Sequence, residues 1–184
     1  MSARRSAAPS EVFDLGAGEE PVSDRDREPA EGAARKPGLS LKGRALRHLA
    51  TREHSRVELE RKLAPHAEAA EQLARVLDEL EASGWLSAER FVASVSYRKA
   101  SRYGLARIKA ELRQHRIPDE VAATVLDELR GTELARAHAL WSRRFDALPA
   151  APEDRARQSR FLAQRGFSGG VIQQVLQGWV PDES

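Results

Sequence analysis

Basic side chains between residues 98 and 116 are the strongest chemical signal in this sequence, and only one acidic residue, Glu111, lies among them. Arg98 and Arg102 are spaced i, i+4, which places both on one face of a helix. Arg113 and Arg116, spaced i, i+3, share a face of the next predicted helix. Because a guanidinium group binds phosphate or carboxylate in a bidentate manner, this pattern favours a surface that binds an anionic partner.

Two alternatives stand beside this interpretation. The charges could form a solubilising face in an arginine-rich chain, although further arginines between residues 143 and 160 favour an extended basic track. Aromatic side chains could stack on nucleobases, but their neighbourhoods (GWL, ALWS, GWV) are typical of helix ends and core anchors. We therefore expect the core to hold the aromatic residues Trp85, Tyr97, Tyr103, Trp141 and Trp179.

Patterns that would indicate an enzyme are missing from the sequence. It has no Gly-x-x-x-x-Gly-Lys-Ser/Thr phosphate loop and no Gly-x-Ser-x-Gly motif. The five histidines are not spaced as metal ligands, and we expect each at the surface or at a boundary. The sequence predicts a protein that is not an enzyme and holds no metal or cofactor.

Composition narrows the class of protein further. The 184 residues include 41% hydrophobic and 5% aromatic residues and no cysteine, which excludes disulfides and thiolate metal sites. The net charge of +2 conceals a gradient, because residues 1–40 hold six basic and eight acidic groups. No apolar run approaches the roughly 20 residues of a membrane span, and the start does not resemble a secretory signal. We expect a cytoplasmic protein with no membrane contact.

The elements that must position the basic residues repeat along the chain. The pentapeptide VLDEL occurs at 76–80 and again at 125–129, an offset of 49 residues. The same offset carries Leu59 onto Ile108 and Leu63 onto Leu112, so the inner faces of two helices are repeated together. Self-similarity at a fixed period is typical of stacked repeats.

Helix start and stop signals divide each repeat into three helices. Ser55-x-x-Glu58 matches a capping box, and Ser87 can cap the helix that follows Gly84. Gly84 suits a left-handed helix end, and Pro118 is expected at the first helical position of a later helix.

A third, less regular copy follows. RARQSRFLAQRGF at 155–167 lies 50 residues after LARIKAELRQHRI, which aligns Leu162 with Leu112 and Phe167 with Ile117. Gln158 then replaces the apolar Ile108, and Ser168 can cap the last helix.

The sequence thus predicts an all-α fold: a tandem array of three three-helix repeats that forms an elongated, curved rod. The expected divisions are a disordered tail at 1–40 and repeats at 41–86, 87–131 and 132–180. A unit of this size buries too little surface to stand alone, so its neighbours must cover it.

Three stretches give the chain a resemblance to a known family. GWLSAERF (84–91), YGLARIKAEL (103–112) and LKGRALRHLATREHSRVELERKL (41–63) are similar to the RecX family, bacterial regulators of the RecA recombinase. The resemblance covers about residues 41–180; the tail lies outside it, and the connection DALPAAPED (146–154) is longer than its counterpart in the second repeat.

The resemblance implies a regulator that binds the RecA–single-stranded DNA filament and inhibits its ATPase, strand-exchange and coprotease activities, in recombination and the SOS response. We also expect a monomer, with weak contact to single-stranded or duplex DNA. The alternative is a helix-turn-helix-like module that acts directly on nucleic acid. Carried over by position, the partner-binding candidates are Arg98, Arg102, Arg107, Lys109, Arg113, Arg116, Arg143, Arg144 and Arg160.

Overall fold

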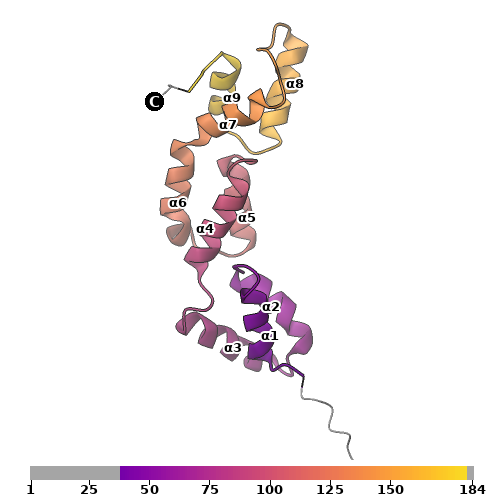
Figure 1. The fold of residues 1–184 in the computed structure, drawn as a ribbon, viewed down its shortest axis with the longest axis vertical. Coiled ribbons are helices and arrows are strands. Elements are labelled where there is room, and N and C mark those ends of the chain that lie inside the picture. Colours follow the sequence, from indigo (N-terminus) through magenta and orange to yellow (C-terminus); the bar gives the residue numbers. More distant parts are fainter. Residues whose placement is uncertain (1–37, 182–184) are drawn as a thin grey trace, which may run out of the picture. The chain divides into compact units, whose positions relative to one another are not determined.

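A computed structural model describes residues 38–181, and the regular secondary structure of these residues is entirely helical (Figure 1). The helices follow the predicted grouping into threes. The first group is α1 (Leu41–Leu49), α2 (Arg56–Leu63) and α3 (Ala70–Ala82), with a 3₁₀ turn, η1 (Ala64–His66), after α2. The second is α4 (Ala88–Lys99), α5 (Leu105–Gln114) and α6 (Asp119–Gly131). The third is α7 (Glu133–Ser142), α8 (Pro152–Ala163) and α9 (Gly169–Leu176).

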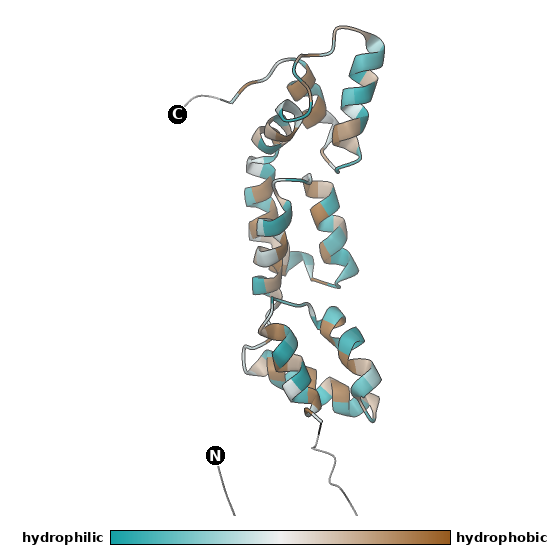
Figure 2. Cartoon of the chain, turned by 45° about the vertical axis from the view of Figure 1, so that its right-hand side comes forward, coloured by the Kyte–Doolittle hydropathy of each residue, from teal (hydrophilic) through white to brown (hydrophobic). Residues whose placement is uncertain are grey.

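Each group of three helices has its own hydrophobic core. The cores lie within residues 41–86, 91–129 and 137–176, and none of them shares a buried residue with another. In Figure 2 brown, hydrophobic segments recur on the helices of each of the three groups. The all-α prediction with three three-helix repeats is therefore confirmed. The repeat limits and the curved rod stay predictions, and the predicted tail lies mostly outside the described residues.

Most of the predicted helix ends are present. Ser55, Ser87 and Ser168 each accept a hydrogen bond from the backbone N–H three residues on. Gly84 has a φ of 74°, the left-handed conformation that favours glycine.

Two predicted helix starts differ in detail. Pro118 lies at the N-cap and not at the first helical position, because α6 begins at Asp119. The capping box of α2 is only half formed, since the Glu58 carboxylate accepts a hydrogen bond from Arg52 at 3.0 Å and does not reach back to the cap. That carboxylate is thereby part of an ion pair in front of the helix.

Gln158 explains why the third repeat looks irregular in sequence. Its side chain is 3% exposed and takes the core position that Ile108 holds in the second repeat. Gln158 Oε1 accepts a hydrogen bond from the indole N–H of Trp141 at 2.7 Å, and its amide nitrogen donates to the carbonyl of Ala147 at 3.2 Å. A polar residue is tolerated there because its polar atoms are paired.

Candidate partner-binding surface

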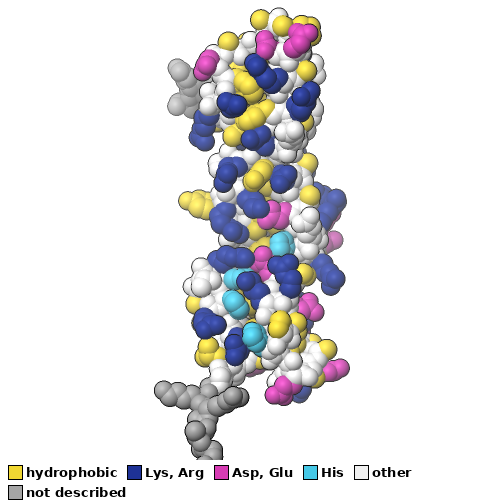
Figure 3. Space-filling model, turned by 90° about the vertical axis from the view of Figure 1, so that its right-hand side faces the viewer, with side chains coloured by type: hydrophobic (Ala, Val, Ile, Leu, Met, Phe, Trp, Pro, Cys, Tyr) yellow, Lys and Arg dark blue, Asp and Glu magenta, His cyan; other side chains and the backbone are white. Residues whose placement is uncertain are grey.

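The second helices of the three repeats carry an extended basic surface. Figure 3 shows the side of the chain on which α2, α5 and α8 lie in Figure 1, and Lys and Arg side chains (dark blue) recur over it. Few acidic side chains (magenta) lie between them in the middle of this face. We use the name basic face for the exposed arginines of these three helices, which are Arg61, Arg107, Arg113, Arg155, Arg157 and Arg160.

The candidates in the second repeat separate into paired and unpaired groups. Lys109 and Arg113 lie 3.6 and 3.9 Å from the carboxylate of Asp119. Lys99 forms an ion pair with Glu111, the acidic residue singled out in the sequence. These pairs are partly solvent-exposed and contribute little to stability, but they reduce the positive charge that a partner would meet.

Four candidates of this repeat form no ion pair within residues 38–181: Arg98, Arg102, Arg107 and Arg116. Arg107 lies over the ring of Tyr103, 4.9 Å from its centroid. Arg116 was expected on the same helix as Arg113, and this is wrong. Helix α5 ends at Gln114, and Arg116 lies in the following turn with a φ of 55°, the one described non-glycine residue with positive φ.

Candidates of the third repeat are exposed. Arg143 and Arg144 follow the end of α7, and Arg160 lies on α8; none forms an ion pair with a described residue. Sequence reasoning missed Arg165 in this repeat. Its guanidinium lies 3.8 Å from the centre of the Phe161 ring and donates to the Phe161 carbonyl at 2.8 Å. The i, i+4 spacing of Phe161 and Arg165 was the signal that could have identified it.

A half-buried arginine from the third repeat, Arg136, fixes the turn that carries Arg102. Arg136 on α7 donates hydrogen bonds to the carbonyls of Ala100, Tyr103 and Leu129 at 2.7–2.8 Å. Burial lowers the pKa of Arg136 below its ordinary value, and the nearby Glu133 carboxylate opposes that shift. The guanidinium thus satisfies carbonyls that would otherwise be left without a partner at the end of α4.

The junction between repeats 2 and 3 also brings two backbones into direct contact. The N–H of Gly104 donates to the carbonyl of Arg165 at 2.9 Å, and that of Ala106 donates to Gly166 at 3.3 Å. A Cβ atom on Gly104 would lie 2.3 Å from the Gly166 carbonyl oxygen, so no other residue fits. Glu133 accepts from the N–H of Leu105 at 2.8 Å and completes the start of α5.

The junction between repeats 1 and 2 relies on side chains instead. Ser55, 1% exposed at the start of α2, is hydrogen-bonded through Oγ to His115 Nδ1 at 2.9 Å. The other ring nitrogen of His115 lies 4.0 Å from the Glu58 carboxylate, and the ring packs edge-on against Phe91. When the repeats are aligned, Ser55 corresponds to Gly104 and His115 corresponds to Arg165.

The aromatic and histidine expectations need correction. Trp141 is buried as predicted, but Trp85 is 58% and Tyr97 is 90% exposed, so the prediction that they anchor the core is wrong. Neither ring belongs to the core of the first or the second repeat. His54 is buried and not at the surface, and its Nδ1 is hydrogen-bonded to the carbonyl of Arg52 at 2.9 Å, which satisfies that buried polar atom.

No helix in residues 38–181 is both long and apolar enough to cross a bilayer. Within the same residues, no three His, Asp or Glu side chains come together as a metal site.

Fold and surface together define a class: a tandem three-helix repeat protein with a basic face. The family model for the third three-helix domain of RecX matches residues 132–176, and that for the second matches residues 89–126. The regulatory protein RecX of Leptothrix cholodnii is 55% identical over 144 residues, which cover 78% of this chain and 92% of the relative. That of Ralstonia nicotianae is 51% identical, covering 76% and 88%. The chain belongs to the RecX family of regulatory proteins.

Solved structures agree on the fold. The crystal structure of RecX from Lactobacillus salivarius superposes with a TM-score of 0.62 at 19% identity, over 74% of this chain and 92% of that one. A further crystal structure of a regulatory protein RecX gives a TM-score of 0.65 over 74% and 71%.

Proposed function

We propose that this chain is a non-enzymatic regulator that binds the RecA–single-stranded DNA filament in the cytoplasm as a monomer, and inhibits its ATPase, strand-exchange and coprotease activities. Membership of a family of regulatory proteins supports the regulatory role. The observation that carries the proposed mode of binding is the basic face, because it recurs on the second helix of each repeat. A filament presents the same acidic groups or phosphates again and again, so three basic helices can engage it at several points at once.

Multivalent contact explains how weak sites would give strong inhibition. Each exposed arginine pair contributes little by itself. Linked sites raise the effective concentration of the second and third contacts, so the whole chain binds far more tightly than one repeat. A rigid link between repeats helps here, because less freedom is lost on binding. The backbone contact between Gly104 and Arg165 provides such a link for the second and third repeats.

The test adds purified protein to RecA already assembled on single-stranded DNA and follows ATP hydrolysis. The variant reverses two charges on the basic face, Arg107→Glu and Arg160→Glu, one on α5 and one on α8. The matched control reverses Arg75 on α3 and Arg130 on α6, two exposed arginines on third helices. We expect about tenfold weaker inhibition from the first variant, corresponding to about 1.4 kcal/mol, and near wild-type inhibition from the control.

Two results would contradict the proposal. Unchanged inhibition by the α5/α8 variant, with helix content intact by circular dichroism, would remove the basic face from filament binding. Strong binding to duplex DNA without recombinase, falling steeply as salt rises, would favour the direct nucleic-acid module. That alternative draws on the exposed α5 residues Arg107, Arg113 and Gln114, which could serve as a recognition helix.

A further inference from the structure

The connection between repeats 1 and 2 passes from one repeat to the next at a single peptide link. Leu86 is buried in the core of repeat 1, and its N–H donates to the carbonyl of Leu80 at 3.0 Å. The next residue, Ser87, caps α4 of repeat 2 and has an extended backbone, with φ −136° and ψ 125°. Two separately anchored residues are therefore neighbours in the chain, and rotation about the bonds between them leaves the backbone hydrogen bonds of both repeats intact.

The connection between repeats 2 and 3 does not allow such a rotation. Thr132 is the one residue between α6 and α7, and its hydroxyl accepts a hydrogen bond from Arg136 Nε at 3.2 Å. Across the same junction, the N–H of Gly104 donates to the carbonyl of Arg165 at 2.9 Å. Turning one repeat against the other would break that backbone bond, and also the three bonds from Arg136 to carbonyls of repeat 2. Repeats 2 and 3 are therefore held as one block.

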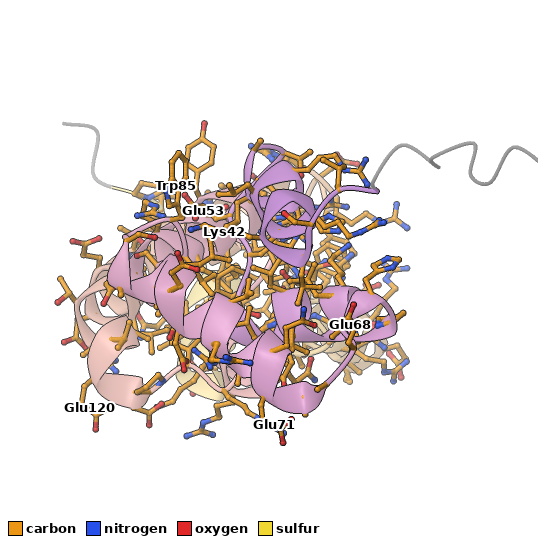
Figure 4. The ribbon with its side chains drawn as sticks, turned by 90° about the horizontal axis from the view of Figure 1, so that it is seen from below. Lys42, Glu53, Glu68, Glu71, Trp85 and Glu120 are labelled. Carbon is orange, nitrogen blue, oxygen red and sulfur yellow. The ribbon has the colours of Figure 1, made fainter. Side chains whose placement is uncertain are left out.

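Contacts of the first repeat with the second are made by side chains. Within residues 38–181, every hydrogen bond that crosses this junction involves a side chain, with Ser55 bonded to His115 at 2.9 Å and Arg90 to Glu53 at 2.8 Å. Figure 4 shows Glu53 and Trp85 at the same edge of the view, so this ion pair lies beside the connecting segment. A partly exposed ion pair can be exchanged for contacts with water at little cost. The first repeat is thus held far less firmly than the third.

A cleft between repeats 1 and 2 gives the first repeat room to move. It has a volume of about 330 Å³, and its walls come from both repeats, with Val57 and Glu81 on one side and Pro118 and Val121 on the other. Closely packed surfaces cannot turn against each other without clashes, whereas the walls of a cleft can approach or separate. The junction of repeats 2 and 3 has no such room at Gly104, where an added Cβ atom would lie 2.3 Å from a backbone oxygen.

We propose that repeat 1 is a hinged arm, which rotates about the Leu86–Ser87 link against a rigid block made of repeats 2 and 3. The contact between Ser55 and His115 holds the arm in the orientation of the structure, and its loss frees the arm to turn and changes the width of the cleft. Hinge motions are concentrated in a few residues at the ends of helices, and units joined by a polar interface are expected to move relative to one another. The inference goes beyond the proposed function and does not depend on it, because it concerns the free chain.

The test measures distances between pairs of spin labels in the full chain by double electron–electron resonance, without recombinase. The chain has no cysteine, so two introduced cysteines carry the labels. Arg75, Thr124 and Gln174 are exposed and occupy equivalent positions of α3, α6 and α9. The pair Arg75→Cys/Thr124→Cys spans the first junction, and Thr124→Cys/Gln174→Cys spans the second. Because both pairs carry the same labels on equivalent helices, we expect the first distance distribution to be at least about twice as wide as the second.

A variant of the contact completes the experiment. His115→Ala should widen the first distribution further and leave the second unchanged, since the bond to Ser55 is lost only at the first junction. His66→Ala, at an exposed histidine of the first repeat, is the control and should change neither distribution. Ser55→Ala replaces His115→Ala if circular dichroism shows that the latter has lost helix content. Equal widths for the two label pairs would overturn the hinge. A first distribution that neither variant of the contact widens would overturn the role of Ser55 and His115 in holding the arm.

Discussion

The two junctions of this chain join equivalent parts of equivalent repeats by different means. Between repeats 2 and 3, the backbone of Gly104 bonds directly to the carbonyl of Arg165, and neither Gly104 nor Gly166 leaves room for a Cβ atom. Between repeats 1 and 2, the corresponding contact runs through the side chains of Ser55 and His115. One geometry of stacking can therefore be held either by close backbone approach or by a pair of side chains.

The two junctions also differ in the backbone strain of the turn that each one contains. Gly166 adopts a φ of 82° and meets Arg107 closely, which glycine alone permits. Arg116 occupies the same position in the second repeat with a φ of 55°, although a left-handed conformation costs a non-glycine residue roughly 1–2 kcal/mol.

The largest expected loss of stability comes from a substitution that breaks the backbone junction between repeats 2 and 3. Gly104→Ala places a Cβ 2.3 Å from the Gly166 oxygen, so the two repeats must move apart and the hydrogen bond to Arg165 is lost. We expect a loss of about 2–4 kcal/mol in the free energy of unfolding, measured by urea denaturation. Gly131→Ala is the control, because a Cβ there meets nothing within 4 Å. Equal stability of the two variants would contradict the tight junction.

A smaller effect is expected at the side-chain junction. Ser55→Ala removes both an N-cap and the contact to His115, whereas Ser87→Ala removes an N-cap and an exposed hydrogen bond to Glu89 but no contact between repeats. We expect about 1 kcal/mol for the loss of each cap, and about 0.5–1.5 kcal/mol more for Ser55. A double-mutant cycle with His115→Ala measures the coupling directly. A coupling near zero would show that Ser55 and His115 do not hold the repeats together.

The smallest effect is the dependence of stability on pH that comes from His54 in the first repeat. Burial lowers the pKa of His54 below 6.5, so the unfolded chain takes up a proton more readily than the folded one. Stability must then fall as the pH drops below about 6.5. The Glu58 carboxylate affects stability at lower pH than His54 does. Burial would raise its pKa, but the hydrogen bond and the charge of Arg52 hold that pKa below 4.5. The stability that this carboxylate contributes is therefore lost only in stronger acid.

The pH dependence can be checked from thermal midpoints between pH 7.5 and 5.5. His54→Gln should reduce the decrease, while His66→Gln, at an exposed position, should leave it unchanged. Equal decreases in both variants would show that another group is responsible.

The sequence predicted the helices well, because the apolar spacing and the cap residues of each helix occur within its own repeat. Leu59 and Ile108, or Ser55 and Ser87, can be identified from spacing alone. The site was harder to predict, since charge pairing depends on neighbours outside the helix. Asp119 follows a turn and still meets Lys109, which reduces the charge that the sequence appeared to offer. Spacing also gave no sign that Arg136 binds carbonyls of the second repeat or that Tyr97 is exposed. Contacts between repeats decide the position of Arg136, and the absence of such contacts leaves Tyr97 in solvent.

The glycine pair at the second junction restricts how such arrays can be lengthened. A Ser–His contact tolerates small shifts in angle, so a copy of that junction could be inserted into another array with few matching changes. The Gly104–Gly166 contact tolerates none, and an added unit would need both glycines in register before it could dock. Modular growth by duplication should therefore proceed from the first repeat, while the last two are inherited together as one block.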